Sequence, residues 1–214
     1  MARIALTLLF FSLPIFFGFL GIIMVESKSG ARVYLEAQCR TAVYRDLCIE
    51  TLLPYVSKKT MLGPQQLARV SLAVCLMKAK QTKEYVNMVA KHLNETTKST
   101  SHGNNNNQAV EECLRQINDG VDQITRSVRE FQLMGKDGEE NFVQHEGNVQ
   151  SWVGAALTNA DLCIDGLLGD GIGGKEKAII KAKFLNVKHH ASNSLAMFNR
   201  FTLRHRASHI VKNP

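Results

Sequence analysis

The residues best suited to chemistry in this 214-residue chain are its seven histidines, because imidazole binds metals and transfers protons near neutral pH. His205 and His209 have the four-residue spacing that places two imidazoles on one helix face. They lie in a basic C-terminal stretch with no acidic residue nearby, which suits a solvated tail better than a cation site. His189 and His190 are adjacent and would point in different directions on a helix. The sequence therefore predicts no metal site and no cofactor.

Motifs of the common enzyme classes are absent from the sequence. It has no glycine-rich phosphate loop after a strand, no HExxH helix, no GxSxG turn and no CxxC pair. Residues 169–174 are rich in glycine, but they follow a predicted helix, so we interpret them as a helix stop. The predicted helices have apolar seams without inward-facing polar residues, which leaves little room for catalysis. We therefore predict a binding protein and not an enzyme.

The N-terminus has the features of a secretory signal peptide. A basic start at Arg3 is followed by an apolar stretch from Ala5 to Val25, and small and polar residues come next. We predict a signal peptide over residues 1–27 and a secreted mature chain over 28–214 that has no membrane segment. Because the apolar stretch is long, a retained signal anchor is the alternative.

The mature chain is basic. The leader contains one base, Arg3, and one acid, Glu26, so the formal net charge of +7 belongs to residues 28–214. In a secreted protein this charge indicates either attraction to polyanions and acidic patches or a well-solvated basic surface. The sequence has no zinc-finger spacing, RNP-like motif or basic-region zipper, so no nucleic-acid partner is predicted.

Five cysteines in an exported chain predict two disulfides and one remaining thiol. Cys39 and Cys48 are close in sequence and form a natural pair. Cys75, Cys113 and Cys163 allow three pairings that cysteine arithmetic does not separate. A sequon at Asn94 is a glycosylation candidate at the start of a polar loop.

Hydrophobic periodicity predicts four long amphipathic helices after Gly63. Their apolar seams run from Leu67 to Leu93, from Val110 to Phe131, from Val149 to Leu167 and from Ile180 to Phe201. Residues 96–108 are predicted to be a loop, and the four asparagines Asn104 to Asn107 are predicted to be its mobile tip. Four methionines are predicted to fill the core or the seams, namely Met77, Met88, Met134 and Met197.

The order of these elements predicts an all-α fold, an up-down-up-down four-helix bundle over about residues 63–205. The segment from about residue 31 to residue 62 has mixed helical periodicity and contains Pro54. This pattern predicts an N-terminal helical hairpin held together by a disulfide. Residues 206–214 are predicted to be a basic tail. Together these parts form one domain over residues 28–214.

Three cysteine contexts and one further segment carry a family resemblance. They are CRTAVYRDLC at 39–48, ECLRQINDGVD at 112–122, SWVGAALTNADLCIDG at 151–166 and SNSLA at 192–196. In this order they resemble the plant invertase and pectin methylesterase inhibitor family, above all its pectin methylesterase branch and the related 21 kDa proteins. The resemblance covers nearly all of the chain after the leader.

The resemblance implies a helical hairpin and four-helix bundle, secretion to the cell wall, and disulfides between Cys39 and Cys48 and between Cys113 and Cys163. Cys75 has no counterpart among the four family cysteines, and its place on an apolar face suggests a buried free thiol. The implied function is binding of one pectin methylesterase molecule and obstruction of its pectin-binding cleft.

The resemblance also implies a partner-binding set of acidic residues. Acids six and nine positions after the third family cysteine and two after the fourth correspond to Asp119, Asp122 and Asp165. Asp119 and Asp122 are three residues apart and would share a helix face turned away from the seam. The plainer interpretation is that they pair with Arg115 and Arg126 at four-residue spacing.

Two departures from the family pattern leave the choice of target open. Arg115 replaces an acid, and Leu162 replaces the threonine before the fourth family cysteine. One alternative is inhibition of a cell-wall or vacuolar acid invertase, although residues 135–142 lack the Pro-Lys-Phe motif that the invertase branch can carry. The other alternative is a wall protein that associates weakly with pectin and inhibits no enzyme.

Overall fold

The computed structural model describes residues 30–57, 60–97, 104–134, 141–167 and 174–212. Every regular element in these ranges is a helix. The predicted signal peptide, 1–27, lies outside the described residues, as do most of the two predicted breaks at 135–138 and 169–174. Among the described residues, no helix combines the length and the apolar character needed to cross a membrane.

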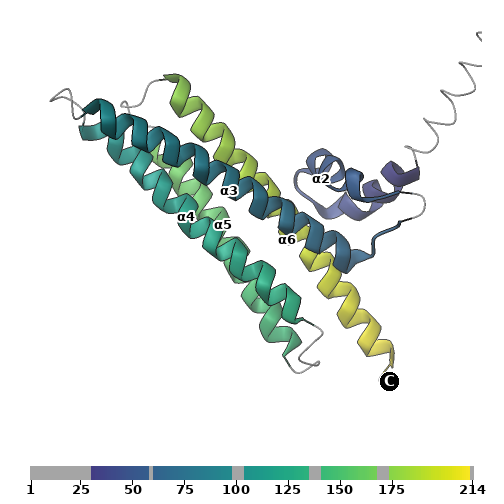
Figure 1. Ribbon diagram of the computed structural model, residues 1–214. Helices are drawn as coiled ribbons and strands as arrows, with labels where there is room; N and C mark the ends of the chain where they lie inside the picture. Colours follow the sequence, from purple (N-terminus) through teal and green to yellow (C-terminus); the bar gives the residue numbers. More distant parts are fainter. Residues whose placement is uncertain (1–29, 58–59, 98–103, 135–140, 168–173, 213–214) are drawn as a thin grey trace, which may run out of the picture.

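Four long helices form the body of the molecule: α3 (Pro64–Thr97), α4 (Asn104–Leu133), α5 (Phe142–Gly166) and α6 (Gly174–Lys212). They run alternately up and down, side by side (Figure 1). Helix α3 packs against α4 and α6, and α5 packs against the same two helices, so the four close into a ring. The predicted all-α, up-down-up-down bundle is confirmed.

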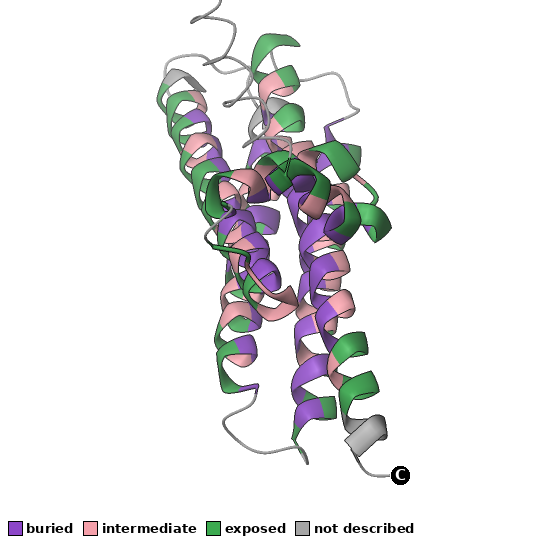
Figure 2. Cartoon of the chain, turned by 90° about the vertical axis from the view of Figure 1, so that its right-hand side faces the viewer, coloured by how far each residue is buried: buried purple, intermediate pink, exposed green. Residues whose placement is uncertain are grey.

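The core consists of the apolar stripes that the periodicity predicts, and buried residues line the inner sides of the helices (Figure 2). Phe131 of α4 and Phe198 of α6 meet edge to face at 5.2 Å between ring centroids. Burying a side chain of this size stabilises the fold by about 1.5–3 kcal/mol. The largest fully buried side chains in this core include Phe131, Phe184, Phe198, Ile117, Ile124 and Ile180.

An N-terminal helical hairpin packs across the bundle. It comprises helical residues 30–38, the 3₁₀ turn η1 (Cys39–Thr41), α2 (Arg45–Leu52) and the 3₁₀ turn η2 (Leu53–Tyr55). The Cys39–Cys48 disulfide closes a separation of nine residues, worth about 3 kcal/mol by the chain-entropy estimate. Helix α2 contacts α3 and α6, so this small unit shares the bundle core.

Two methionines predicted to fill the core lie on the surface. Met77 is 44% exposed and Met88 is 58% exposed, whereas Met134 and Met197 are buried. The buried stripe of α3 includes the small residues Cys75 and Ala79. Met77 is two residues from each of them, which places it on the opposite side of the helix.

Two of the bundle helices, α4 and α6, are longer than the sequence predicts. Helix α4 begins at Asn104, so the asparagine run predicted to be a loop tip is helical. Asparagine is favoured at helix N-termini, which agrees with this position. Helix α6 continues to Lys212, past the boundary expected near residue 205. In this extension Arg206 Nη2 donates to Glu146 Oε1 at 2.9 Å, and the ring of His205 stacks on Phe142.

The prediction that no polar residue faces inward was wrong. The hydroxyl oxygens of Ser71 and Ser194 are 3.0 Å apart in the interior. Glu130 Oε1 accepts a hydrogen bond from Asn148 Nδ2 at 2.6 Å and contacts His145 Nδ1 at 2.9 Å. Because these groups bond to one another, their burial costs much less than the burial of isolated polar groups.

Candidate partner-binding surface

The three acids implied as partner contacts lie on two neighbouring antiparallel helices. Asp119 and Asp122 belong to α4 and Asp165 to the last turn of α5, and all three are exposed. The Cys113–Cys163 disulfide joins the two helices with a Cα–Cα distance of 4.7 Å. It closes a separation of 50 residues, worth about 4 kcal/mol by the chain-entropy estimate.

The disulfide also sets the spacing of the acids along the bundle. Asp119 is six residues beyond Cys113, and Asp165 is two residues beyond Cys163 on a helix that runs the other way. With a rise of 1.5 Å per residue, the two positions are about 12 Å apart along the axis. The structure therefore brings Asp119 and Asp122 together and keeps Asp165 at a distance suited to a broad protein contact. No group of metal-binding side chains occurs in the described ranges.

The acids on α4 are not engaged by the arginines that the sequence offers them. Arg115 pairs with Glu112, three residues earlier, rather than with Asp119. Within the part of the chain that the structure describes, Asp122 forms no ion pair with Arg126. Hydrogen bonds from Gln116 and Arg115 lower the pKa of Glu112, so this carboxylate is the one that the helix neutralises. Asp119 and Asp122 therefore present unneutralised charge to solvent.

On α5 the acids differ in their partners. Asp161 Oδ1 accepts a hydrogen bond from Lys188 Nζ of α6 at 2.5 Å. This hydrogen bond is the main reason that the pKa of Lys188 is raised, and the charge of Asp165 acts in the same direction. Asp165 is thus exposed beside a lysine that another carboxylate already holds, which leaves it available to a partner.

An exposed apolar side chain lies on α5 near Asp165. Leu162 is 50% exposed, one position before the buried Cys163 and three before Asp165. Nearby, Asn159 Nδ2 of α5 donates to Gln123 Oε1 of α4 at 3.2 Å and links the outer edges of the two helices. We use the name α4–α5 acidic surface for Asp119, Asp122, Leu162 and Asp165.

Sequence analysis noted Leu162 only as a departure from the family pattern and did not predict its exposure. The signal was present, because Cys163 occupies the seam and the preceding residue is rotated by about 100° out of it. The Asp161–Lys188 pair was missed altogether. It joins residues that are 27 positions apart on different helices. A pattern of local spacing cannot predict such a contact.

The fifth cysteine, Cys75, is buried away from solvent. Cys75 is a free, fully buried cysteine on α3. Burial raises the pKa of its thiol to about 12, although a hydrogen bond with Ser194 acts in the opposite direction. Since the thiolate is the reactive form, Cys75 is inert in the folded protein at neutral pH.

The glycosylation candidate Asn94 lies in the last turn of α3 rather than at the start of a loop. It is exposed, and its Nδ2 donates to Glu111 Oε1 of α4 at 3.1 Å. Glycosylation at this position stays a prediction.

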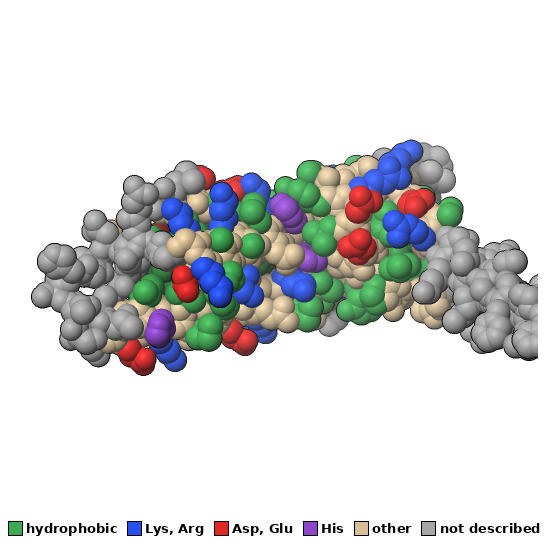
Figure 3. All heavy atoms as spheres, turned by 90° about the horizontal axis from the view of Figure 1, so that it is seen from above, with side chains coloured by type: hydrophobic (Ala, Val, Ile, Leu, Met, Phe, Trp, Pro, Cys, Tyr) green, Lys and Arg blue, Asp and Glu red, His purple; other side chains and the backbone are tan. Residues whose placement is uncertain are grey.

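Charges of both signs are mixed on the face seen from above in Figure 3. Seen from above, Lys and Arg side chains occur along the visible length and alternate with acidic and hydrophobic ones (Figure 3). This distribution agrees with a well-solvated basic surface on that face, where no large single-sign patch is seen.

Relatives with assigned names share most of the chain. Pectinesterase inhibitor 11 of Arabidopsis thaliana is 32% identical over 173 residues, which are 80% of this chain and 82% of that protein. Pectinesterase inhibitor 9 of the same plant is 33% identical over 176 residues, 82% of this chain and 83% of that protein. The 21 kDa protein of Daucus carota is 29% identical over 192 residues, 90% of this chain and 95% of that protein.

The fold also has solved counterparts. The crystal structure of mutant form A of a pectin methylesterase inhibitor from Arabidopsis superposes with a TM-score of 0.55 at 16% identity, over 77% of this chain and 95% of that one. At this identity the similarity establishes the fold alone. A family model described as "Plant invertase/pectin methylesterase inhibitor" matches residues 33–197. The chain therefore belongs to the plant invertase/pectin methylesterase inhibitor family.

Proposed function

We propose that this protein is a secreted inhibitor that binds pectin methylesterase through the α4–α5 acidic surface and covers the pectin-binding cleft of the enzyme. The observation that carries the proposal is the pair of exposed, unneutralised carboxylates Asp119 and Asp122, at the spacing from Cys113 that the family resemblance implies. Relatives named pectinesterase inhibitor support the choice of enzyme. The family consists of inhibitor proteins, so the chain itself is not an enzyme.

The physical basis of inhibition is a rigid, preformed contact. The disulfide between α4 and α5 holds the acids in one arrangement, so little conformational entropy is lost on binding. The carboxylates would speed the encounter with a basic or hydrogen-bond-donating cleft rim. Leu162, half-exposed and three residues before Asp165, offers an apolar side chain that the enzyme would bury in the contact.

Titration of pectin methylesterase with the mature chain, residues 28–214, tests the proposal. Activity should fall linearly with added protein at enzyme concentrations above the Kd, with an endpoint at one inhibitor per enzyme. The Asp119→Ala/Asp122→Ala/Asp165→Ala variant should require much higher concentrations. Full enzyme activity at a large excess of parent protein, for every member of a panel of plant pectin methylesterases, would exclude the proposal.

Inhibition of acid invertase is the second candidate, because the family that matches residues 33–197 covers both targets. The missing Pro-Lys-Phe motif counts against it. The same titration against purified cell-wall and vacuolar invertases decides between the two. Inhibition of an invertase without inhibition of any pectin methylesterase would reverse the order.

A further inference from the structure

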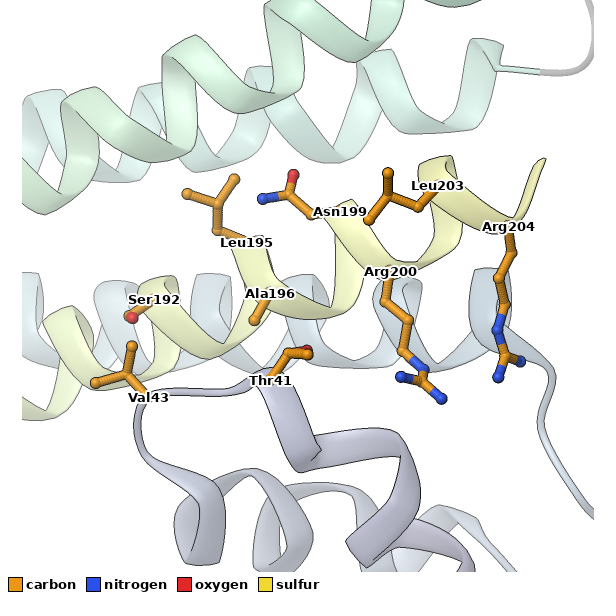
Figure 4. A pocket seen from close by; sticks show the side chains of 9 residues that line it. All are labelled: Thr41, Val43, Ser192, Leu195, Ala196, Asn199, Arg200, Leu203 and Arg204. Carbon is orange, nitrogen blue, oxygen red and sulfur yellow. The ribbon is translucent and has the colours of Figure 1, made fainter. Parts of the chain in front are cut away.

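A groove lies beside α6, on a part of the molecule that the α4–α5 acidic surface does not include. It has a volume of about 450 Å³ and is bounded by the η1 end of the hairpin and by α6 from Ser192 to Arg204. Figure 4 shows Thr41 and Val43 of the hairpin facing α6, and the side chains of Arg200 and Arg204 projecting from α6 on the side of the hairpin. Segments about 150 residues apart thus form one concave, elongated surface.

Two arginines line one end of this groove, and the charge of a third acts on one of them. Arg200 and Arg204 line it, and Arg40 lies close enough for its charge to act on Arg200. Partial burial, followed by the like charges of Arg204 and Arg40, lowers the pKa of Arg200. No ion pair involves any of the three within the described ranges. The next arginine along α6, Arg206, is neutralised by Glu146.

Leaving three guanidinium groups together is electrostatically unfavourable, and an anion between them would remove the repulsion. Arg200 Nε donates to Gln38 Oε1 at 3.1 Å, which holds this side chain while its other donors remain available. A guanidinium group binds a carboxylate through two parallel hydrogen bonds. The charge at this end of the groove therefore matches a ligand that carries several carboxylates.

The rest of the lining matches a polyhydroxylated ligand. Thr41 and Ser192 supply hydroxyl groups, which exchange hydrogen bonds with sugar hydroxyls. Asn199 Oδ1 already accepts from Gln150 Nε2 at 3.0 Å, so this residue offers its Nδ2. Val43 and Leu203 are 74% and 62% exposed at the edge, where the apolar C–H face of a sugar ring would cover them. The stretch of α6 from Ser192 to Arg204 rises about 18 Å, which is long enough for an extended oligomer.

We propose that this arginine groove binds unesterified stretches of an acidic polysaccharide, the polyuronate chain that pectin becomes when its methyl esters are removed. A methyl-esterified stretch carries no charge and would lose the arginine contacts. This inference rests on the proposed function only in choosing pectin as the acidic polymer that the secreted chain meets.

The arginine end of the groove and Asp165 lie toward different ends of the α5–α6 pair. Lys188 of α6 pairs with Asp161, close in sequence to Asp165, whereas Arg204 is 16 residues further along α6. That separation is about 24 Å along the helix. An inhibitor bound to its enzyme through Asp165 would therefore keep the arginine groove open and could stay attached to polymer that the enzyme has already de-esterified.

Calorimetric titration of the mature chain with an unesterified oligogalacturonate of defined length tests the proposal. The fully methyl-esterified oligomer of the same length and poly-glutamate with the same number of carboxylates are the comparison ligands. The expected result is binding of the unesterified sugar, with at least about tenfold weaker binding of each comparison ligand. Equal binding of poly-glutamate would overturn the sugar assignment, and equal binding of the methyl ester would overturn the role of the arginines.

Variants locate the site. Arg40→Gln/Arg204→Gln leaves the Arg200–Gln38 hydrogen bond in place and should weaken oligogalacturonate binding by about tenfold. Lys80→Gln/Lys91→Gln removes the same charge from exposed positions on α3 and should change binding by less than about threefold. Equal losses in the two variants would show general attraction to a basic protein and overturn the proposal. Because the titration contains no enzyme, its failure is distinct from a failure to inhibit pectin methylesterase.

Discussion

The side-chain amide of Asn193 forms two hydrogen bonds with the backbone of Tyr44, 149 residues earlier in the chain. Asn193 Oδ1 accepts from the Tyr44 amide at 3.1 Å, and Asn193 Nδ2 donates to the Tyr44 carbonyl at 2.8 Å. The neighbouring His189 stacks on the Tyr44 ring with 3.7 Å between centroids. These contacts attach the hairpin to α6 and shape the wall of the arginine groove.

Replacing Asn193 should loosen the hairpin. In Asn193→Ala both backbone groups of Tyr44 lose their partner, and Asn193 is 2% exposed, so the free energy of unfolding should fall by about 1–3 kcal/mol. Urea denaturation measures the change. Asn186→Ala, at a half-buried position of the same helix, should stay within about 0.5 kcal/mol of the parent. Equal midpoints for the two variants would remove Asn193 from hairpin docking.

The acidic surface can be tested apart from stability. Asp119→Ala/Asp122→Ala/Asp165→Ala should leave the thermal midpoint nearly unchanged, because exposed acids contribute little to folding. It should weaken inhibition of pectin methylesterase by at least about tenfold, since each lost contact to a charged group costs about 1.5 kcal/mol or more.

A charge-matched control separates this effect from net charge. Asp46→Ala/Glu50→Ala/Glu84→Ala removes three exposed acids from α2 and α3 and should inhibit like the parent. If the first triple variant inhibits as strongly as this control, Asp119, Asp122 and Asp165 do not contact the enzyme.

The buried thiol should report on unfolding. Cys75 should react with iodoacetamide only in denaturant, because burial raises its pKa to about 12 and excludes the reagent. Non-reducing peptide mapping of the alkylated protein should recover Cys39 joined to Cys48 and Cys113 joined to Cys163. Rapid labelling of Cys75 in native buffer would contradict its burial.

His190 should make the fold less stable in acid. Burial, together with the charges of Lys78 and His189, lowers its pKa from 6.5 to about 4. The unfolded chain therefore binds this proton at a higher pH than the folded chain does, so stability is full above about pH 6.5 and declines as pH falls toward 4. The expected loss is on the order of 3 kcal/mol by pH 4.

Urea denaturation midpoints of the parent and of His190→Gln, measured between pH 7 and pH 4.5, test whether His190 causes the loss of stability in acid. The variant should lose the part of the pH slope that His190 causes and keep the part that comes from the carboxylates. Parallel pH profiles for the two proteins would assign the acid sensitivity to other groups.

The extension of α6 should contribute to stability. Arg206 neutralises Glu146, whose side chain is 6% exposed, so Arg206→Ala leaves a buried carboxylate without its cation. The free energy of unfolding should fall by about 2–4 kcal/mol. Glu146→Gln/Arg206→Ala should recover part of the loss, because the amide carries no charge. If Arg206→Ala leaves the free energy of unfolding unchanged, the C-terminal turns of α6 do not contribute to the stability of the fold.

Much of this structure could be predicted from the sequence because the relevant signals are local. The apolar seams ending at Leu93, Phe131, Leu167 and Phe201 follow a 3.6-residue period that needs no knowledge of the partner helix. Cys39 and Cys48 are close enough in sequence to be paired by inspection. The spacing of Asp119 and Asp122 likewise placed them together on the outer face of one helix.

The tertiary structure decided what depends on how the helices are rotated against one another. The buried stripe of α3 passes through Cys75 and Ala79, which turns Met77 outward although its type suits a core. The hydrogen-bonded pairs inside the bundle, such as Ser71 with Ser194, join residues far apart in the chain. The arginine groove combines Thr41 and Val43 of the hairpin with α6, to which the Asn193–Tyr44 contacts attach the hairpin. Periodicity records the face that each helix buries, whereas these features arise from contacts between helices, which only the packed chain specifies.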